Sequence, residues 1–314
     1  MECAIDVEEL TKDFNGFRAL DGVSFRVDRG HVVGYLGPNG AGKTTTIKIL
    51  TNLIRPTSGH AYICGIDVNR NPKEALRNIG SMIEVPGVYD YLTPHEMLCY
   101  TGRIHGMRKS EIEERIVEVL ELTKIQDWEH KRIGSFSTGM IRRLMIAQTV
   151  LHSPGILILD EPAIGLDPKG IRDVRNLIRR FQKEEITVFM SSHILPEVSE
   201  TCDSVIFLNK GKVVSYNSIE DVQSEMASTH LDIRFLRPPT SEERRRLEDL
   251  EQIVQLELQE DRAKVEFDGN PETASAILED IVNTGIKVVS YSPEIVSLED
   301  FYVSIMSDER GVGD

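Results

Sequence analysis

A glycine-rich run in the first fifty residues has the spacing of a phosphate-binding loop. It reads Gly37-Pro38-Asn39-Gly40-Ala41-Gly42-Lys43-Thr44 and fits the pattern G-x-x-x-x-G-K-[ST] throughout. Glycines let backbone N–H groups close around phosphate oxygens, and the start of the following helix adds the positive end of its dipole. Lys43 is expected to pair with β- and γ-phosphate oxygens, and the Thr44 hydroxyl to bind Mg²⁺. The predicted nucleotide-binding residues are Gly37, Pro38, Asn39, Gly40, Ala41, Gly42, Lys43, Thr44 and Thr45.

Two adjacent carboxylates, Asp160 and Glu161, follow an apolar run at Ile156 to Leu159. Ligands of open α/β sheets bind at the carboxyl ends of strands. Asp160 is therefore expected to hold Mg²⁺ through water, and Glu161 to orient or activate an attacking water. The same pair could form a solvated turn after a strand, but the upstream phosphate loop favours the catalytic interpretation.

The elements that must position these residues alternate strands and helices over about the first 220 residues. The runs His31 to Leu36, Ile156 to Leu159 and Thr187 to Met190 predict buried strands of a parallel sheet, and a helix is expected from Lys43 to about Leu53. Residues 90–152 are mostly helical in pattern. Thr93-Pro94-His95-Glu96 is a helix start, and Ser110 to Leu122 repeats apolar residues at helical spacing.

Three further motifs follow the phosphate loop in the chain. Phe136-Ser137-Thr138-Gly139-Met140 precedes the Asp160 strand, Ile164-Gly165-Leu166-Asp167-Pro168 follows it, and Ser191-Ser192-His193 follows the third strand. With these motifs, residues 5–217 resemble the ATP-binding-cassette (ABC) ATPase family. The resemblance implies ATP as the nucleotide, with Mg²⁺. It also implies phosphate contacts from Ser137 and Gly139, a dimer-seam position beside the nucleotide for Asp167, and a γ-phosphate-sensing role for His193.

The chain departs from the family pattern at several positions. Phe136, Thr138 and Met140 replace three residues of the family's LSGGQ motif, and Glu84 stands where a glutamine is usual. A carboxylate can still bind Mg²⁺ or order water, so Glu84 is expected to be both catalytic and a metal ligand. Alternatively it is a solvated loop charge. The Glu84 variant is similar to bacitracin- and lantibiotic-type exporters, which favours export.

Other motif residues keep a structural alternative beside the functional one. Phe14 occupies the place of the family's adenine-stacking aromatic, although Phe17 could serve instead and either could be a core residue. Ser137 could simply cap a helix, and His193 could be a structural histidine.

The resemblance implies that a complete ATP site needs two chains. In the family, ATP lies between the phosphate loop of one cassette and the Ser137 motif of another, and this chain has one of each. A two-fold homodimer is the simplest arrangement. A separate membrane permease would contact the segment Val88-Tyr89-Asp90-Tyr91-Leu92, although these tyrosines could equally pack within the helical subdomain.

The composition is that of an ordinary soluble protein, with 40% hydrophobic and 28% charged residues. No apolar run approaches the roughly 20 residues that span a bilayer, and the start does not resemble a signal peptide. We expect a cytoplasmic protein, peripheral on the cytoplasmic face of the cell membrane. The cysteines, without metal-like spacing, are expected to be reduced structural thiols; they are Cys3, Cys64, Cys99 and Cys202.

The net charge of −15 lies almost wholly in the last third of the chain. Met1 to Ile219 carries 27 basic and 28 acidic residues, whereas the remainder carries 9 basic and 23 acidic ones. An acidic surface repels phosphate backbones, so no nucleic-acid partner is expected. Between His230 and Tyr291 the pattern predicts a ferredoxin-like βαββαβ order. This unit could regulate or help to dimerise the protein, or only stabilise it.

The predicted fold is therefore an α/β P-loop NTPase cassette at residues 1–220, with a helical subdomain at about 88–152. A small α+β accessory domain follows at 221–314.

The predicted function is ATP hydrolysis in an ABC exporter, where dimer closure is coupled to the permease. The alternative is a soluble ABC ATPase acting on nucleic acid or the ribosome. The 43–137 stretch is too short for the coiled coil of repair types, and translation types usually hold two cassettes. A non-catalytic nucleotide sensor would be expected to lack Glu161 or His193, and both residues are present.

Overall fold

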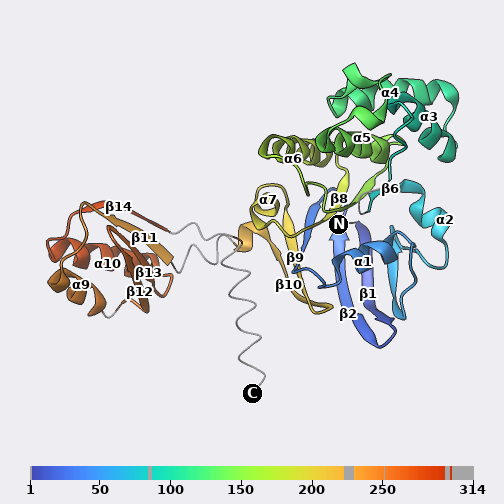
Figure 1. The fold of residues 1–314 in the computed structure, drawn as a ribbon. Coiled ribbons are helices and arrows are strands. Elements are labelled where there is room, and N and C mark those ends of the chain that lie inside the picture. The colour runs from blue at the N-terminus through green and yellow to red at the C-terminus, as the bar shows by residue number, and fades with distance from the viewer. Residues whose placement is uncertain (1, 84–86, 223–229, 251, 294–297, 299–314) are drawn as a thin grey trace. The chain divides into compact units, whose positions relative to one another are not determined.

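The computed structural model describes residues 2–83, 87–222, 230–250, 252–293 and 298. The chain divides into two compact units, residues 1–217 and residues 218–314. Figure 1 shows the elements of both units, and each unit has a hydrophobic core of its own. In the described part of the chain, no helix combines the length and the apolar character that crossing a bilayer requires.

The first unit is built on a six-stranded sheet of order β10-β9-β3-β8-β7-β6. Its strands are β3 (Val32–Leu36), β6 (Ile79–Met82), β7 (Ile156–Asp160), β8 (Thr187–Ser192), β9 (Ser204–Asn209) and β10 (Lys212–Ser218). The pairs β9-β3, β3-β8, β8-β7 and β7-β6 are parallel. Every residue of β3, β7 and β8 is buried, as the apolar runs predict for a parallel sheet covered on both faces.

A second, antiparallel sheet of order β2-β1-β4-β5 was not predicted from the sequence. It contains β1 (Cys3–Phe14), β2 (Phe17–Asp28), β4 (Ser58–Ile63) and β5 (Ile66–Asp67). Asn15 and Gly16, both at positive φ, form the two-residue turn between β1 and β2, a conformation that this residue pair favours. The helix α1 (Lys43–Leu50) contacts β2, β4 and β7. One hydrophobic core therefore joins α1 to both sheets.

The helix α1 ends three residues before the predicted position near Leu53. Thr51 caps it, and Asn52 then adopts a left-handed conformation with φ of 54°, which an α-helix cannot continue through. Arg55-Pro56 follows soon after, and the residue before a proline disfavours helix.

The helices α3 (Pro94–Ile104), α4 (Lys109–Leu122) and α5 (Thr138–Val150) contact one another and form a helical subdomain (Figure 1). The predicted start of α3 is confirmed: Thr93 Oγ1 accepts from Glu96 N, and Glu96 Oε2 accepts from Thr93 N. The buried residues of α4 are those at the predicted helical spacing. The remaining helices of this unit are α2 (Pro72–Ala75), α6 (Pro168–Lys183), α7 (Leu195–Ser199) and the 3-10 turns Leu76–Asn78, Gln126–Trp128 and Ile133–Ser135.

The second unit has the β-α-β-β-α-β element order of a ferredoxin-like domain. Its elements are β11 (His230–Phe235), α9 (Ser241–Glu248), β12 (Gln255–Gln259), β13 (Arg262–Glu266), α10 (Pro271–Asn283) and β14 (Val288–Pro293). The antiparallel sheet has the order β12-β13-β11-β14. Alternate residues of β11 enter a core that belongs to this unit alone. The Tyr291 hydroxyl donates to Ala274 O over 2.6 Å and links β14 to α10.

Candidate nucleotide-binding site

The glycine-rich loop connects the buried end of β3 to the first turn of α1. Within the described residues, no side chain caps α1, so backbone N–H groups of its first turn can bind a ligand. Gly42 has a φ of 113°, and a Cβ there would lie 2.6 Å from Leu20 Cδ2. A Cβ at Gly37 would lie 2.2 Å from Leu208 O. Only glycine fits these two positions. Of the remaining loop residues, Ala41 is buried and the exposed ones are Pro38, Asn39 and Gly40.

The Lys43 ammonium is held against the loop itself. The side chain is nearly buried, at 7% exposure, and Nζ donates to Gly37 O at 2.7 Å and Pro38 O at 3.4 Å. Glu161 Oε1 lies 3.9 Å from Nζ. Burial lowers the pKa of Lys43, while the carboxylates of Glu161 and Asp160 act in the opposite direction. With two carbonyls and one distant carboxylate as partners, this ammonium can still donate to a phosphate oxygen.

The carboxylates at the end of β7 are fixed by the neighbouring strand. The register of β7 against β8 places Asp160 opposite Ser191. Ser191 Oγ donates to Asp160 Oδ1 at 2.5 Å and accepts from Glu161 N at 3.0 Å. Ser191 belongs to a motif that the sequence singles out, but it was not predicted to be a site residue. The strand-end position that it shares with Asp160 was the available signal.

Glu161 lies in a left-handed conformation, with a φ of 48°. Non-glycine residues adopt this region rarely, and such conformations cost about 1–3 kcal/mol and cluster at functional sites. Its side chain reaches His193, whose Nδ1 lies 2.8 Å from Glu161 Oε2. Thr44 and Thr45, both half-buried, occupy the first turn of α1 directly after Lys43. The structure therefore brings the predicted cation, carboxylates and imidazole to one edge of the sheet.

The two other motifs lie at helix starts. Ser137 caps α5, where its Oγ accepts from Met140 N at 3.3 Å, and it remains exposed to solvent. Gly139 follows in the first turn of α5. Asp167 caps α6, where its Oδ1 accepts from Gly170 N at 2.9 Å. The capping role considered for Ser137 is thus present, and it leaves the N-terminus of α5 facing solvent.

Two arginines that follow the Ser137 motif tie α5 to its surroundings. Arg142 is buried, and its guanidinium donates to Ile164 O at 3.4 Å and lies 3.8 Å from Met82 Sδ. Burial lowers the pKa of Arg142. Arg143 donates to Asp173 of α6 at 2.5 Å. These contacts, which were not predicted from the sequence, connect the helical subdomain to the loop after β7 and to α6.

Among the described residues, no hydrogen bond or ion pair links the remaining predicted residues to the group formed by Lys43, Asp160, Glu161 and His193. Phe14 and Phe17 form the last pair of the β1-β2 hairpin and are 43% and 63% exposed, so neither is a core residue. Glu84 lies outside the described residues. Tyr89 and Tyr91 are exposed, with their ring centroids 5.8 Å apart, which argues against a packing role within the helical subdomain.

Comparison with known proteins decides the family. Residues 20–164 match the family model described as ABC transporter. The bacitracin transport ATP-binding protein of Bacillus licheniformis is 46% identical over 215 residues, covering 68% of this chain and 69% of that protein. The chain belongs to the ATP-binding subunits of ABC transporters.

One further relative extends the sequence match beyond the cassette, and one solved structure matches the fold of the cassette. The daunorubicin/doxorubicin resistance ATP-binding protein of Streptomyces peucetius is 31% identical over 306 residues, covering 96% of this chain and 92% of that one. A solved structure of an ATP-binding subunit of an ABC transporter aligns with a TM-score of 0.65 at 30% identity, covering 71% of this chain and 92% of its own. The predicted cassette fold is confirmed.

Proposed function

We propose that this ABC subunit hydrolyses ATP with Mg²⁺ and uses the energy to drive export through a separate membrane permease. The observation that carries the proposal is the connected cluster of Lys43, Glu161 and His193, with Asp160 beside it. These groups come from the first residue of α1 and from the ends of β7 and β8. Phosphoryl transfer to water needs a cation at the phosphates and a carboxylate that orients the nucleophile, and this cluster supplies both.

The donor set fits Mg²⁺, which prefers hard oxygen ligands. Thr44 would offer a hydroxyl and Asp160 a carboxylate. Asp160 is 4% exposed and is oriented by the Ser191 hydroxyl, an arrangement suited to a metal-facing carboxylate. When bound with ATP, Mg²⁺ would neutralise phosphate charge that develops in the transition state.

The chain's own residues perform the remaining steps. Lys43 exchanges its loop carbonyls for phosphate oxygens, a stronger charge-assisted interaction. Glu161 accepts a hydrogen bond from the attacking water and orients it in line with the leaving group. His193 holds the Glu161 carboxylate and, at 42% side-chain exposure, is open to the γ-phosphate. Phe14, or Phe17 in its place, stacks on adenine.

We also assign Glu84 to the site, as a carboxylate that binds Mg²⁺ or orders water. Glu84→Gln restores the residue usual in the family, so its turnover is expected to stay within about an order of magnitude of wild type. Loss of turnover in this variant would show that the carboxylate has a role of its own.

A second copy of the chain completes the nucleotide site. One chain carries one phosphate loop and one Ser137 motif, in which Ser137 is exposed, so a two-fold dimer gives two equivalent sites. In each site, Ser137 and Gly139 at the N-terminus of α5 would face the γ-phosphate, with Asp167 at the seam. Because hydrolysis removes these bridging contacts, the dimer alternates between closed and open states.

Export is supported by the relatives, whose names concern bacitracin transport and daunorubicin/doxorubicin resistance. The exposed pair Tyr89 and Tyr91 suits contact with a permease on the cytoplasmic face of the membrane. The test is a pull-down of tagged Glu161→Gln with ATP from detergent-solubilised native cells. A co-purifying polytopic membrane protein supports transport. Recovery of DNA, ribosomes or a soluble complex without such a protein overturns it in favour of a soluble ABC ATPase.

A further inference from the structure

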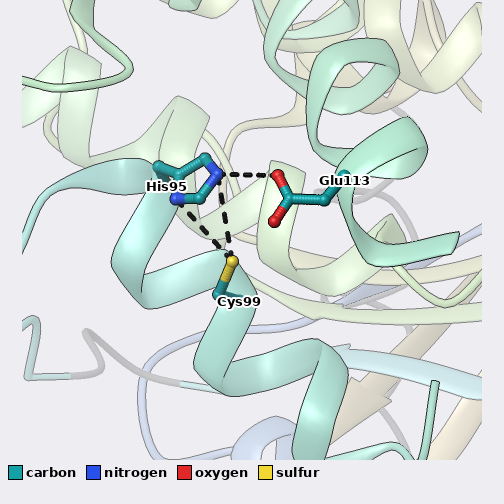
Figure 2. A group of neighbouring side chains, drawn as sticks. All are labelled: His95, Cys99 and Glu113. Atoms are coloured by element: carbon teal, nitrogen blue, oxygen red, sulfur yellow. Dashed lines mark hydrogen bonds and ion pairs between the residues drawn. The ribbon is translucent and has the colours of Figure 1, made fainter. Parts of the chain in front are cut away.

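His95, Cys99 and Glu113 form a cluster of metal-binding side chains away from the nucleotide loop. His95 and Cys99 lie one turn apart on α3, and Glu113 comes from the first turns of α4 (Figure 2). One ligand atom from each residue lies within 4.8 Å of the others. The spacing between cysteines gave no sign of this group, because its other two ligands are a histidine and a glutamate.

Figure 2 shows the three side chains pointing toward one another. His95 Nε2 lies 2.9 Å from Glu113 Oε2 and 4.0 Å from Cys99 Sγ. Nitrogen, sulfur and oxygen ligands of tetrahedral Zn²⁺ lie about 2.0–2.3 Å from the metal, which places neighbouring ligand atoms about 3.4–3.6 Å apart. The two His95 separations bracket this value, and the whole set lies within 4.8 Å, so shifts of up to about one ångström would seat an ion between the three atoms.

The surroundings hold the cluster in place and leave it accessible. Glu129 O accepts from the backbone N of His95 at 3.1 Å, which fixes the N-terminal end of α3. His95 and Cys99 are half-buried, whereas Glu113 is exposed. All three line an open pocket of about 660 Å³, together with Tyr89 and Tyr91. An ion could enter from solvent and keep one coordination position for water.

We propose that His95, Cys99 and Glu113 bind a thiophilic divalent transition-metal ion, Zn²⁺ in the first instance. A thiolate, an imidazole and a carboxylate form a donor set that selects zinc-like ions over Mg²⁺ or Ca²⁺. The ion binds the unprotonated Nε2 of His95 in place of its hydrogen bond with Glu113, and the Cys99 thiol releases its proton to solvent on binding. Since the ligands come from both helices, the ion cross-links α3 to α4.

This site is independent of the proposed ATP hydrolysis and is tested without nucleotide. The full-length reduced protein is titrated with Co²⁺ under anaerobic conditions, and absorption is recorded. A thiolate ligand produces a near-ultraviolet charge-transfer band. Ions held by Asp160 or His193 at the nucleotide site cannot produce this band, because none of the residues placed there is a cysteine. The expected result is a band that saturates at one ion per chain and is abolished by Zn²⁺.

Variants assign the band to its ligands. Cys99→Ser should lose it, and His95→Ala and Glu113→Gln should each bind Co²⁺ at least about tenfold more weakly. Cys64→Ser removes another half-buried thiol, and His60→Ala breaks a histidine–carboxylate contact that has no thiol, so both should bind as wild type does. Circular dichroism confirms that each variant is folded.

The thermal midpoint gives a second readout that does not depend on the absorption band. Because Zn²⁺ binds only the folded site, it should raise the melting temperature of wild type more than that of Cys99→Ser. A wild-type protein without the band, or a Cys99→Ser variant that retains it, would overturn the proposal. Equal Zn²⁺-induced shifts in wild type and Cys99→Ser would do the same.

Discussion

At the scale of single residues, a buried charge and a rarely adopted backbone conformation occur together near the ends of β3, β7 and β8. Lys43 is a nearly buried cation whose closest partners are loop carbonyls, and Glu161 is held at a positive φ with its carboxylate on His193. Burying a charge without a full partner is costly unless a ligand completes the pairing. Lys43 is therefore suited to binding an anion such as a phosphate group, as the proposed function requires.

Removing this cation should weaken nucleotide binding. Lys43→Ala deletes a charge-assisted hydrogen bond, so its ATP affinity is expected to fall by about ten- to a hundredfold. Equilibrium dialysis with labelled ATP measures the change. Lys183→Ala, which removes an exposed lysine at the end of α6, is the matched control and should bind as wild type does. Unchanged ATP affinity in Lys43→Ala would contradict the placement of the phosphates.

Residues defined by local spacing were predictable, and those defined by pairing across the sheet were not. The loop from Gly37 to Thr44 and the pair Asp160-Glu161 are contiguous, so their chemistry is visible in the sequence. The hydrogen bonds of Ser191 to Asp160 and Glu161 depend on the register of β7 against β8, which a single sequence does not specify. The same holds for Glu113, which approaches His95 only because α3 and α4 pack together.

At the scale of elements, two histidines join the helical subdomain to the parallel sheet. His152, just after α5, has its Nε2 3.0 Å from Ile79 O of β6. Its ring stacks on that of His105, which follows α3, with centroids 3.8 Å apart. Burial, together with the charges of His105 and Arg115, lowers the pKa of His152 to about 4, and burial lowers the pKa of His105.

This junction should make the protein less stable in acid. The unfolded His152, with an ordinary pKa near 6.5, binds a proton that the folded state excludes until the pH is close to 4. The free energy of unfolding is therefore retained above about pH 6.5 and falls as the pH drops through this window. After a discount for partial exposure, wild type should lose about 1–2 kcal/mol more than His152→Gln between pH 7 and pH 5.

Urea unfolding of both proteins at the two pH values measures the difference. Glutamine can keep a donor for Ile79 O while removing the titration. His130→Gln, at an exposed histidine, is the control and should follow wild type. Identical acid losses in wild type and His152→Gln would show that His152 is not the group responsible.

Periodicity and capping residues predicted which segments form helices or strands, but they did not predict which strands pair with one another. The capping box at Thr93 and the spacing of buried residues in α4 are local signals, and both were confirmed. The β1-β2 hairpin was missed although its Asn15-Gly16 turn is a local signal. The pairing of β1 with β4 was missed because its register depends on contacts across about fifty residues of chain. The short end of α1 was missed because the left-handed Asn52 gives no apolar signal.

At the scale of the whole molecule, the chain consists of two units with separate cores. Every residue assigned to the nucleotide site has a number below 218 and so belongs to the first unit. The acidic excess belongs to the second unit, whose surface is therefore unsuited to phosphate-rich partners.

A chain that ends at Asn217 should fold and bind ATP. Its affinity is expected to stay within about threefold of the full chain, a difference below about 1 kcal/mol, because the first unit contains the whole phosphate loop and its own core. Thermal unfolding and ATP titration of the two proteins measure this. A truncated chain that is folded but does not bind ATP would place part of the nucleotide site in the second unit.

The most direct test of the central claim is the ATPase rate of Glu161→Gln beside its ATP affinity. If Glu161 orients the attacking water, the variant binds ATP with near wild-type affinity, and its turnover falls by at least about a hundredfold. Glu200→Gln, at an exposed carboxylate paired with Arg175, is the control and should retain turnover. Turnover of Glu161→Gln close to that of wild type would contradict the assignment of the catalytic carboxylate.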